Sequence, residues 1–308
     1  MLMLSFEMAI GDGNHSLPAH LGGVLHGFFE GAVKEQAPHL LPVLRPGGDN
    51  KSAHFMILSP PMGQAIEHLL RFGVMLYGVA AEAWPVLVRA LVVQQLQQIN
   101  NRNVRIRLAW LQQPGNPAQA LMAHGRLLDV SPPILEAPGT LYRRIYAEQP
   151  PTSARRIHTL TFRSPLLLAS RKAQRDRLPA TGALPCPTLG SLLDSIAQRM
   201  RELEPGLAEM TGLPPAWIAT KACRSIEALT SAADPARPVN WDYFSTPRAN
   251  AAAPPPTHRR LRLPGIGGVL SYPASNDELE HALLYWGQWL GVGQKTTMGC
   301  GSYVLTTC

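Results

Sequence analysis

The first half of the chain alternates between two hydrophobic periods, one typical of strands and one typical of helices. Short apolar segments predict strands at residues 1–10, 53–59, 68–78 and 104–111. Longer segments with apolar positions every three to four residues predict helices at about 18–36 and 81–99. The segment 68–78 is compatible with either structure, and we assign it to a strand. The resulting order, β-α-β-β-α-β, is typical of a ferredoxin-like or RNA-recognition-type unit.

The second half of the chain gives a similar series. The pattern predicts a strand at 157–168, an amphipathic helix at 189–204, further helical residues within 212–235, an extra strand at 239–245, a hairpin at 258–274 around Pro264-Gly265, and a helix at 276–290 capped by Ser275 or Asn276. A glycine-rich loop and a final strand follow that helix. We therefore expect an α+β protein with two tandem ferredoxin-like domains, spanning residues 1–150 and 151–308.

The strand at 104–111 also carries a prediction about its two faces. Strict alternation places Val104, Ile106, Leu108 and Trp110 on one face, and Arg105 and Arg107 on the other.

Positive charge is concentrated in one segment. The chain has a net charge of +7. Residues 139–177 hold nine Lys/Arg against two Asp/Glu, whereas acidic and basic residues balance on either side. A patch this concentrated suits a polyanion such as nucleic acid, although a solvated basic loop would have the same composition.

The remaining composition narrows the class of protein. The four cysteines, Cys186, Cys223, Cys300 and Cys308, form no CxxC pair and have no metal-ligand spacing, so we expect neither a metal site nor a cofactor. Free thiols fit a reducing cytoplasm. The first ten residues lack the basic region and cleavage site of a signal peptide. The longest uncharged apolar run, residues 72–81, is too short to cross a bilayer, so no membrane partner is expected.

The C-terminal glycine-rich loop resembles a known family. The segment GVGQKTTMGCGSYVL (291–305) is similar to the loop of the CRISPR precursor-RNA (repeat) processing endoribonucleases of the RAMP superfamily, which has a pattern like G-h-G-x-K-T-x-x-G-x-G-x-h. Here Gly291, Gly293, Lys295, Thr296, Gly299 and Gly301 fill this pattern. The segments 160–168 and 55–91 agree more weakly with the family's two domains, while 170–257 has no match.

The resemblance implies both a fold and an activity. The family has two ferredoxin-like domains and cuts precursor RNA at the base of a repeat hairpin without a metal, leaving a 2′,3′-cyclic phosphate and a 5′-hydroxyl. Its members often retain the product and join other subunits of a CRISPR effector complex. Variants serving type IV systems have helical insertions in the second domain, and the unmatched segment at about 170–257 would suit such a variant.

The family often places its general base, a histidine, on the first helix of the N-terminal domain, which corresponds here to His26. Histidine suits this role because its pKa lies near neutral pH. His15, His20 and His39 remain alternatives. The same helix carries Gly23, Gly27 and Gly31 in a stripe beside His26, which predicts a close approach by RNA or, more commonly, by a packed strand.

Members of the family often have a tyrosine near this histidine, at a position we align with Gly23, so that group is missing here. Some relatives rely on basic side chains instead. Arg45 and Lys51 are then candidates for stabilising the charge of the transition state, although each could equally be a solvated loop cation.

The predicted RNA-binding residues fall into two groups. Glycine amides of the loop are unshielded by side chains and can contact phosphates, with help from Lys295, Thr296 and Thr297. The cations that would bind phosphates along a hairpin are Arg143, Arg144, Arg155, Arg156, Arg163, Arg171, Lys172, Arg175, Arg177, Arg259, Arg260 and Arg262.

Two alternatives to the endoribonuclease stay open. The chain could be a non-catalytic RAMP-type subunit that holds guide RNA, which the missing tyrosine favours. It could also be an α+β nucleic-acid-binding protein unrelated to CRISPR systems.

Overall fold

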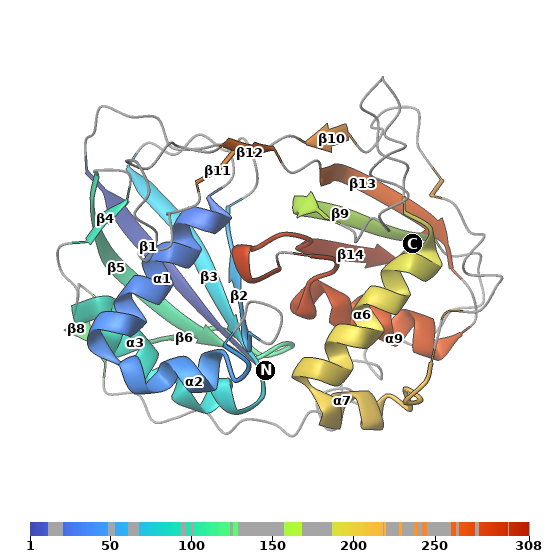
Figure 1. Ribbon diagram of the computed structural model, residues 1–308, viewed down its shortest axis with the longest axis horizontal. Coiled ribbons are helices and arrows are strands. Elements are labelled where there is room, and N and C mark those ends of the chain that lie inside the picture. The colour runs from blue at the N-terminus through green and yellow to red at the C-terminus, as the bar shows by residue number, and fades with distance from the viewer. Residues whose placement is uncertain are drawn as a thin grey trace, which may run out of the picture.

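The computed structural model describes most of both predicted domains (Figure 1). The described residues are 1–11, 21–48, 53–60, 68–93, 97–99, 102–123, 126–128, 157–167, 187–217, 219, 228–229, 237–239, 242–244, 260–262, 265–274, 277–294 and 296–307. The predicted boundary near residue 150 lies outside them and stays a prediction. No helix in the described part is both long and apolar enough to cross a membrane.

The N-terminal domain has the predicted β-α-β-β-α-β order. Its main elements are β1 (Leu2–Ile10), α1 (Gly22–Gln36), β2 (Phe55–Leu58), β3 (Leu69–Leu76), α3 (Trp84–Val93) and β5 (Arg102–Gln112). Shorter elements are η1 (Pro38–Leu40), α2 (Leu41–Leu44), η2 (Gly78–Ala83), β4 (Gln97–Ile99), β6 (Gln119–Ala120), β7 (Met122–Ala123) and β8 (Arg126–Leu127). The strands form an antiparallel sheet in the order β2-β3-β1-β5-β4, with α1 and α3 in front of it (Figure 1).

The C-terminal domain repeats this plan. Its elements are β9 (Ile157–Leu166), α6 (Leu189–Leu203), α7 (Pro205–Met210), β10 (Arg237–Val239), β11 (Asp242–Phe244), β12 (Arg260–Arg262), β13 (Gly265–Pro273), α9 (Glu278–Leu290), η3 (Thr296–Met298) and β14 (Tyr303–Thr307). The main sheet has the antiparallel order β10-β13-β9-β14, and α6 packs beside α9. The fold is therefore the expected pair of tandem ferredoxin-like domains.

The segment expected as a helical insertion contains α6 and α7. Thr188 caps α6 by accepting a hydrogen bond from the amide of Ser191, and the helix buries a face that includes Leu192 and Ile196. These side chains belong to the main core of the C-terminal domain. Thus α6 is one of the two helices that this domain packs together, and most of the rest of 170–257 lies outside the described residues.

Two predictions about strands were wrong. Segment 258–274 does not form a hairpin, because β12 pairs with β11 while β13 pairs with β9 and β10. On β5, a bulge at Arg107 shifts the register, since Ile106 lies opposite Met8 and Leu108 lies opposite Glu7. Beyond the bulge Ala109 and Leu111 are buried, so Leu108 and Trp110 turn away from the face that carries Val104 and Ile106.

The two domains have the same order of elements and also pack against each other. Met56 and Met75 of the N-terminal sheet, and Tyr77 directly after β3, lie in the hydrophobic cluster of the C-terminal domain. The buried Tyr77 hydroxyl donates to the carbonyl of Trp289 at 2.8 Å, and burial raises its pKa well above the ordinary value. Because a buried hydroxyl needs such a partner, this hydrogen bond helps to fix α9 against β3.

The glycine stripe of α1 does not receive a packed strand at its exposed positions. Gly27 and Gly31 are exposed, and a Cβ built at either would meet no described heavy atom within 4 Å apart from the backbone of its own helix. We therefore expect Gly27→Ala to raise the free energy of unfolding by about 1 kcal/mol, because alanine loses less backbone entropy in a helix. Urea denaturation of the two proteins measures this, and a loss of stability would mean that a close contact exists there.

Candidate active site at the domain interface

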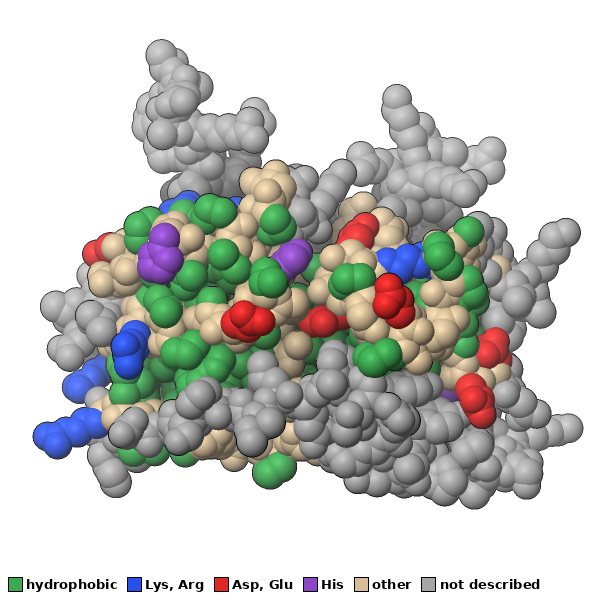
Figure 2. All heavy atoms as spheres, turned by 90° about the horizontal axis from the view of Figure 1, so that it is seen from below, with side chains coloured by type: hydrophobic (Ala, Val, Ile, Leu, Met, Phe, Trp, Pro, Cys, Tyr) green, Lys and Arg blue, Asp and Glu red, His purple; other side chains and the backbone are tan. Residues whose placement is uncertain are grey.

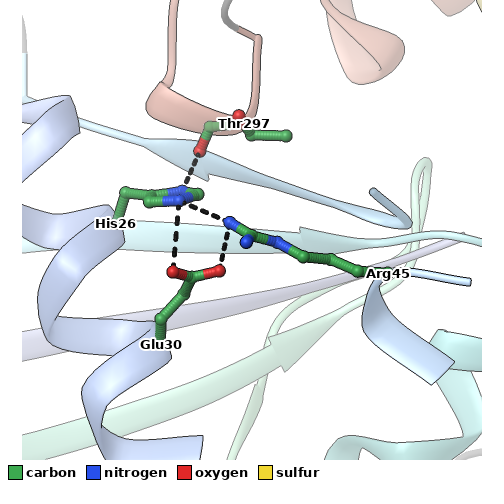
Figure 3. Close-up of polar contacts among 4 residues, drawn as sticks. All are labelled: His26, Glu30, Arg45 and Thr297. Atoms are coloured by element: carbon green, nitrogen blue, oxygen red, sulfur yellow. Dashed lines mark hydrogen bonds and ion pairs between the residues drawn. The ribbon is translucent and has the colours of Figure 1, made fainter. Parts of the chain in front are cut away.

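His26 lies on the face of α1 that meets the C-terminal domain. Its side chain is buried, and its ring stacks on Phe55 of β2 with 5.4 Å between the ring centres. Nδ1 lies 3.1 Å from the carbonyl oxygen of Thr297 in η3, and Nε2 lies 2.8 Å from a guanidinium nitrogen of Arg45 (Figure 3). Since a carbonyl can only accept and a guanidinium can only donate, Nδ1 carries the proton and Nε2 accepts. His26 is thus a neutral imidazole.

Arg45 is the C-cap residue directly after α2, and Glu30 follows His26 by four positions on α1. One oxygen of Glu30 pairs with Arg45, and the other lies 3.7 Å from Nε2 of His26 (Figure 3). The guanidinium carbon of Arg45 also lies 5.8 Å from the centre of the Phe55 ring. His26 and Arg45 therefore both lie against the Phe55 ring, and Glu30 contacts the two of them.

The pKa of His26 is lowered from its ordinary value, first because burial disfavours the charged imidazolium. The Glu30 carboxylate and the Thr297 carbonyl act in the opposite direction, while the cations of Arg45 and Lys34 lower the pKa further. The net direction is downward, so the imidazole stays neutral at neutral pH. A neutral imidazole is the form that a general base requires.

Two polar atoms next to the imidazole have unused hydrogen-bonding capacity. Nε of Arg45 and the hydroxyl of Thr297 are buried, and neither has a hydrogen-bond partner among the described residues. Buried polar groups in proteins are nearly always paired, so such atoms at one site call for an explanation. Both atoms can donate a hydrogen bond.

The glycine-rich loop does not expose its glycine amides as we expected. The amides of Gly291, Gly293, Gly299 and Gly301 donate to the carbonyl of Gly287, the hydroxyl of Ser195, the carbonyl of Thr296 and the carbonyl of Pro165. The loop uses these four amides to hold its own shape and to attach to β9 and α6, so they are not free for a phosphate. The assignment of the four glycines to an RNA-binding site stays a prediction.

The glycines are required by close packing instead. A Cβ at Gly299 would lie 2.5 Å from the carbonyl oxygen of Ile57 on β2, and one at Gly291 would lie 2.6 Å from the sulfur of Met56. Both glycines also have a positive φ. The loop therefore crosses the domain interface and delivers the Thr297 carbonyl to His26.

The other candidate residues are distributed as follows. Arg163 on β9 and His39 in η1 are both exposed. Arg260 and Arg262 belong to β12, but their side chains are outside the described part. The candidates outside the described residues are His15, His20, Lys51, Arg143, Arg144, Arg155, Arg156, Arg171, Lys172, Arg175, Arg177, Arg259 and Lys295.

The described part of one face carries few basic side chains. Figure 2 shows the lower face, where apolar side chains predominate, the visible Lys and Arg side chains are scattered, and Asp and Glu side chains lie between them. The described part of this face thus carries no continuous basic surface.

Sequence reasoning missed the roles of Glu30 and Phe55. The spacing of four between His26 and Glu30 signals a shared helix face, and could have suggested the pair. Phe55 and the Thr297 carbonyl leave no comparable signal. Among the described residues, no group of three or more His, Cys, Asp or Glu side chains is placed to hold a metal ion.

Comparison with known proteins gives a consistent assignment. Residues 160–303 match the family described as CRISPR-associated endoribonuclease Cas6. No curated protein is matched in sequence. The chain therefore resembles the CRISPR repeat-processing RAMP proteins, as the glycine-rich loop predicted.

Solved structures share the fold along the whole chain. Two Cas6 product complexes match with TM-scores of 0.56 and 0.53 at 16% and 19% identity, covering 99% of this chain and 98% and 100% of theirs. A RAMP protein that binds different RNA substrates matches with a TM-score of 0.52 at 11% identity, covering 99% of this chain and 100% of its own.

Proposed function

We propose that this Cas6-like chain is a CRISPR RNA-processing endoribonuclease that cuts precursor RNA within its repeats, at the base of a hairpin. The observation that carries the proposal is the neutral His26, whose pKa is lowered by burial and whose ring is fixed between Thr297, Arg45 and Phe55. A fixed neutral base beside a cation is what cleavage by an RNA 2′-hydroxyl requires.

In this mechanism, Nε2 of His26 takes the proton of the 2′-hydroxyl next to the scissile phosphate. The 2′-oxygen attacks phosphorus in line, the bond to the 5′-oxygen breaks, and that oxygen takes a proton from a water molecule. The imidazolium of His26 then returns its proton to the resulting hydroxide, which restores the base. The products are a 2′,3′-cyclic phosphate and a 5′-hydroxyl. Arg45, with Lys51 as a second candidate, offsets charge on the phosphorane-like transition state. No metal takes part in these steps.

The remaining residues would bind the hairpin. Arg163, exposed on β9, and the cations of 139–177 and 259–262 would contact phosphates, and Lys295 with Thr296 and Thr297 would act from the glycine-rich loop. The protein would retain its product and associate with other subunits of a CRISPR effector complex, in the cytoplasm, where a free thiol such as the buried Cys300 persists. A type IV system is the candidate context.

The test uses pure protein, a labelled repeat RNA and EDTA. We expect one specific cut that yields a cyclic phosphate, and we expect a single 2′-deoxy substitution at the cleaved nucleotide to abolish it. Cutting that persists with the deoxy substrate would exclude the 2′-hydroxyl mechanism. Binding should weaken steeply as salt rises, because phosphate contacts release counterions.

A second candidate function is a non-catalytic RAMP-type subunit that holds guide RNA. Two observations favour it: Arg45 already occupies the base nitrogen of His26, and Gly23 stands where a helper tyrosine is expected. Tight binding of repeat RNA without any cleavage would support this function over the endoribonuclease.

A further inference from the structure

We infer that Glu30 is a positioning residue that holds Arg45 across the base nitrogen of His26, and that an RNA phosphate draws Arg45 away and so releases the base. The inference rests on the proposed function and deepens it. It assigns a role to Glu30, and it makes the contact between Arg45 and His26 the resting state of the site rather than its working state.

The first step concerns the lone pair of Nε2. A base nitrogen must be free to accept the proton of the 2′-hydroxyl, yet Nε2 accepts a hydrogen bond from Arg45 at 2.8 Å. Nδ1 cannot replace it, because Nδ1 carries a proton and faces the Thr297 carbonyl. The observed arrangement therefore blocks the base until Arg45 moves.

The second step concerns what holds Arg45. Its guanidinium has a carboxylate partner in Glu30, on a side chain that is only 14% exposed, and it lies near the face of Phe55. Its Nε has no hydrogen-bond partner among the described residues. A phosphate can accept two parallel hydrogen bonds from a guanidinium, which a single imidazole nitrogen cannot. An RNA phosphate can therefore accept more hydrogen bonds from Arg45 than the imidazole of His26 can.

The third step concerns the charges around His26 after Arg45 has moved from the imidazole to the phosphate. Glu30 and Arg45 together are neutral, and a phosphate adds one negative charge beside them. Glu30 then remains 3.7 Å from Nε2 without the intervening cation, and both anions favour the imidazolium. The proton that leaves the 2′-hydroxyl therefore arrives at a nitrogen whose positive charge is stabilised. The same carboxylate that restrains Arg45 at rest assists His26 during the reaction.

The groups that face His26 come from every described element packed against it. α1 supplies Glu30 and Lys34, the end of α2 supplies Arg45, η3 supplies the Thr297 carbonyl, and β2 supplies only the uncharged Phe55. Glu30 raises the pKa of His26 and Arg45 lowers it. Removing the two residues one at a time must therefore displace the pKa in opposite directions.

The test measures the pKa of His26 by NMR in the full-length protein, first without RNA and then with 2′-deoxy repeat RNA, which binds without being cut. We expect Arg45→Ala to raise the pKa, Glu30→Gln to lower it, and the deoxy RNA to raise it in the wild type. Glu209→Gln, which removes an exposed carboxylate from α7, is the matched control and should leave it unchanged.

Cleavage provides the second readout. The low-pH limb of kcat/KM should move to higher pH in Arg45→Ala and to lower pH in Glu30→Gln. The rate of Arg45→Ala at its plateau should fall ~10²-fold, since a cation at the transition state is lost, whereas Arg45→Lys should recover part of it.

The outcomes separate the two proposals. Displacements of the pKa in the same direction, or a pKa that the deoxy RNA leaves unchanged, would overturn the role of Glu30 and Arg45 even if the protein cuts repeat RNA. If the two variants displace the pKa of His26 in opposite directions and the deoxy RNA raises it, but the protein never cuts repeat RNA, the role of Glu30 and Arg45 is supported. The endoribonuclease function is then rejected.

Discussion

Replacing His26 with asparagine is expected to lower the rate of repeat-RNA cleavage by about 10²–10⁴-fold, the range typical of a lost general base. The asparagine amide can still donate to the Thr297 carbonyl in place of Nδ1, so the contact between α1 and η3 survives. Asparagine cannot take a proton at neutral pH. Single-turnover kinetics measure the loss, and binding of the uncut RNA should change little.

A second variant separates chemistry from structure. His26→Ala removes the base and also the hydrogen bonds of the imidazole to the Thr297 carbonyl and to Arg45, which keeps its ion pair with Glu30. It should therefore also lower the free energy of unfolding by about 1–3 kcal/mol. His39→Ala, at an exposed histidine of η1, should cleave at the wild-type rate. Cleavage that survives in His26→Asn but is lost in His39→Ala would assign the base to His39.

The second large effect concerns Gly301, whose replacement by alanine should destabilise the protein by ~3 kcal/mol or more. Its φ is 70°, and a Cβ there would lie 1.7 Å from the carbonyl oxygen of Val292. The positive φ costs about 1–3 kcal/mol for a residue with a side chain, and the overlap with backbone adds to it. Urea denaturation at one temperature measures the change.

Gly206→Ala is the matched control. Gly206 is exposed on α7, and a Cβ there would meet no described atom outside its own helix within 4 Å, so the substitution should stabilise the protein by about 0.5–1 kcal/mol. If Gly301→Ala were as stable as the wild type, the loop would not be held by the contact with Val292. Its glycines would then need another explanation, such as the direct phosphate contact that their hydrogen-bonded amides argue against.

The periodicity of the chain predicted the main helices and strands because each one buries a single face. On α6, Leu192 and Ile196 are spaced for one side of a helix, and that side meets the core. The pattern failed where an element depends on a distant partner. The bulge at Arg107 arises from pairing with β1, and the strand at 265–273 pairs with β9 rather than with its neighbour in sequence.

The helix predicted at 81–99 is another such case. The structure ends α3 at Val93 and uses Gln97–Ile99 as the short edge strand β4 beside β5. Local apolar spacing cannot distinguish the last turn of a helix from a short strand, because the choice depends on the open edge that β5 offers. Boundaries of this kind require the tertiary structure.

The sequence by itself predicted two halves with similar series of strands and helices. It also gave the family resemblance through the glycine-rich loop, and it identified His26 and Arg45 as candidate site residues. Only the tertiary structure decided that His26 touches Thr297, 271 positions away, and that Arg45 and Glu30 meet at its other nitrogen. It also decided that the loop's glycine amides are already hydrogen-bonded. The physical reason is that residue types fix which groups can donate, accept or pack closely, whereas their partners depend on how the two sheets pack together.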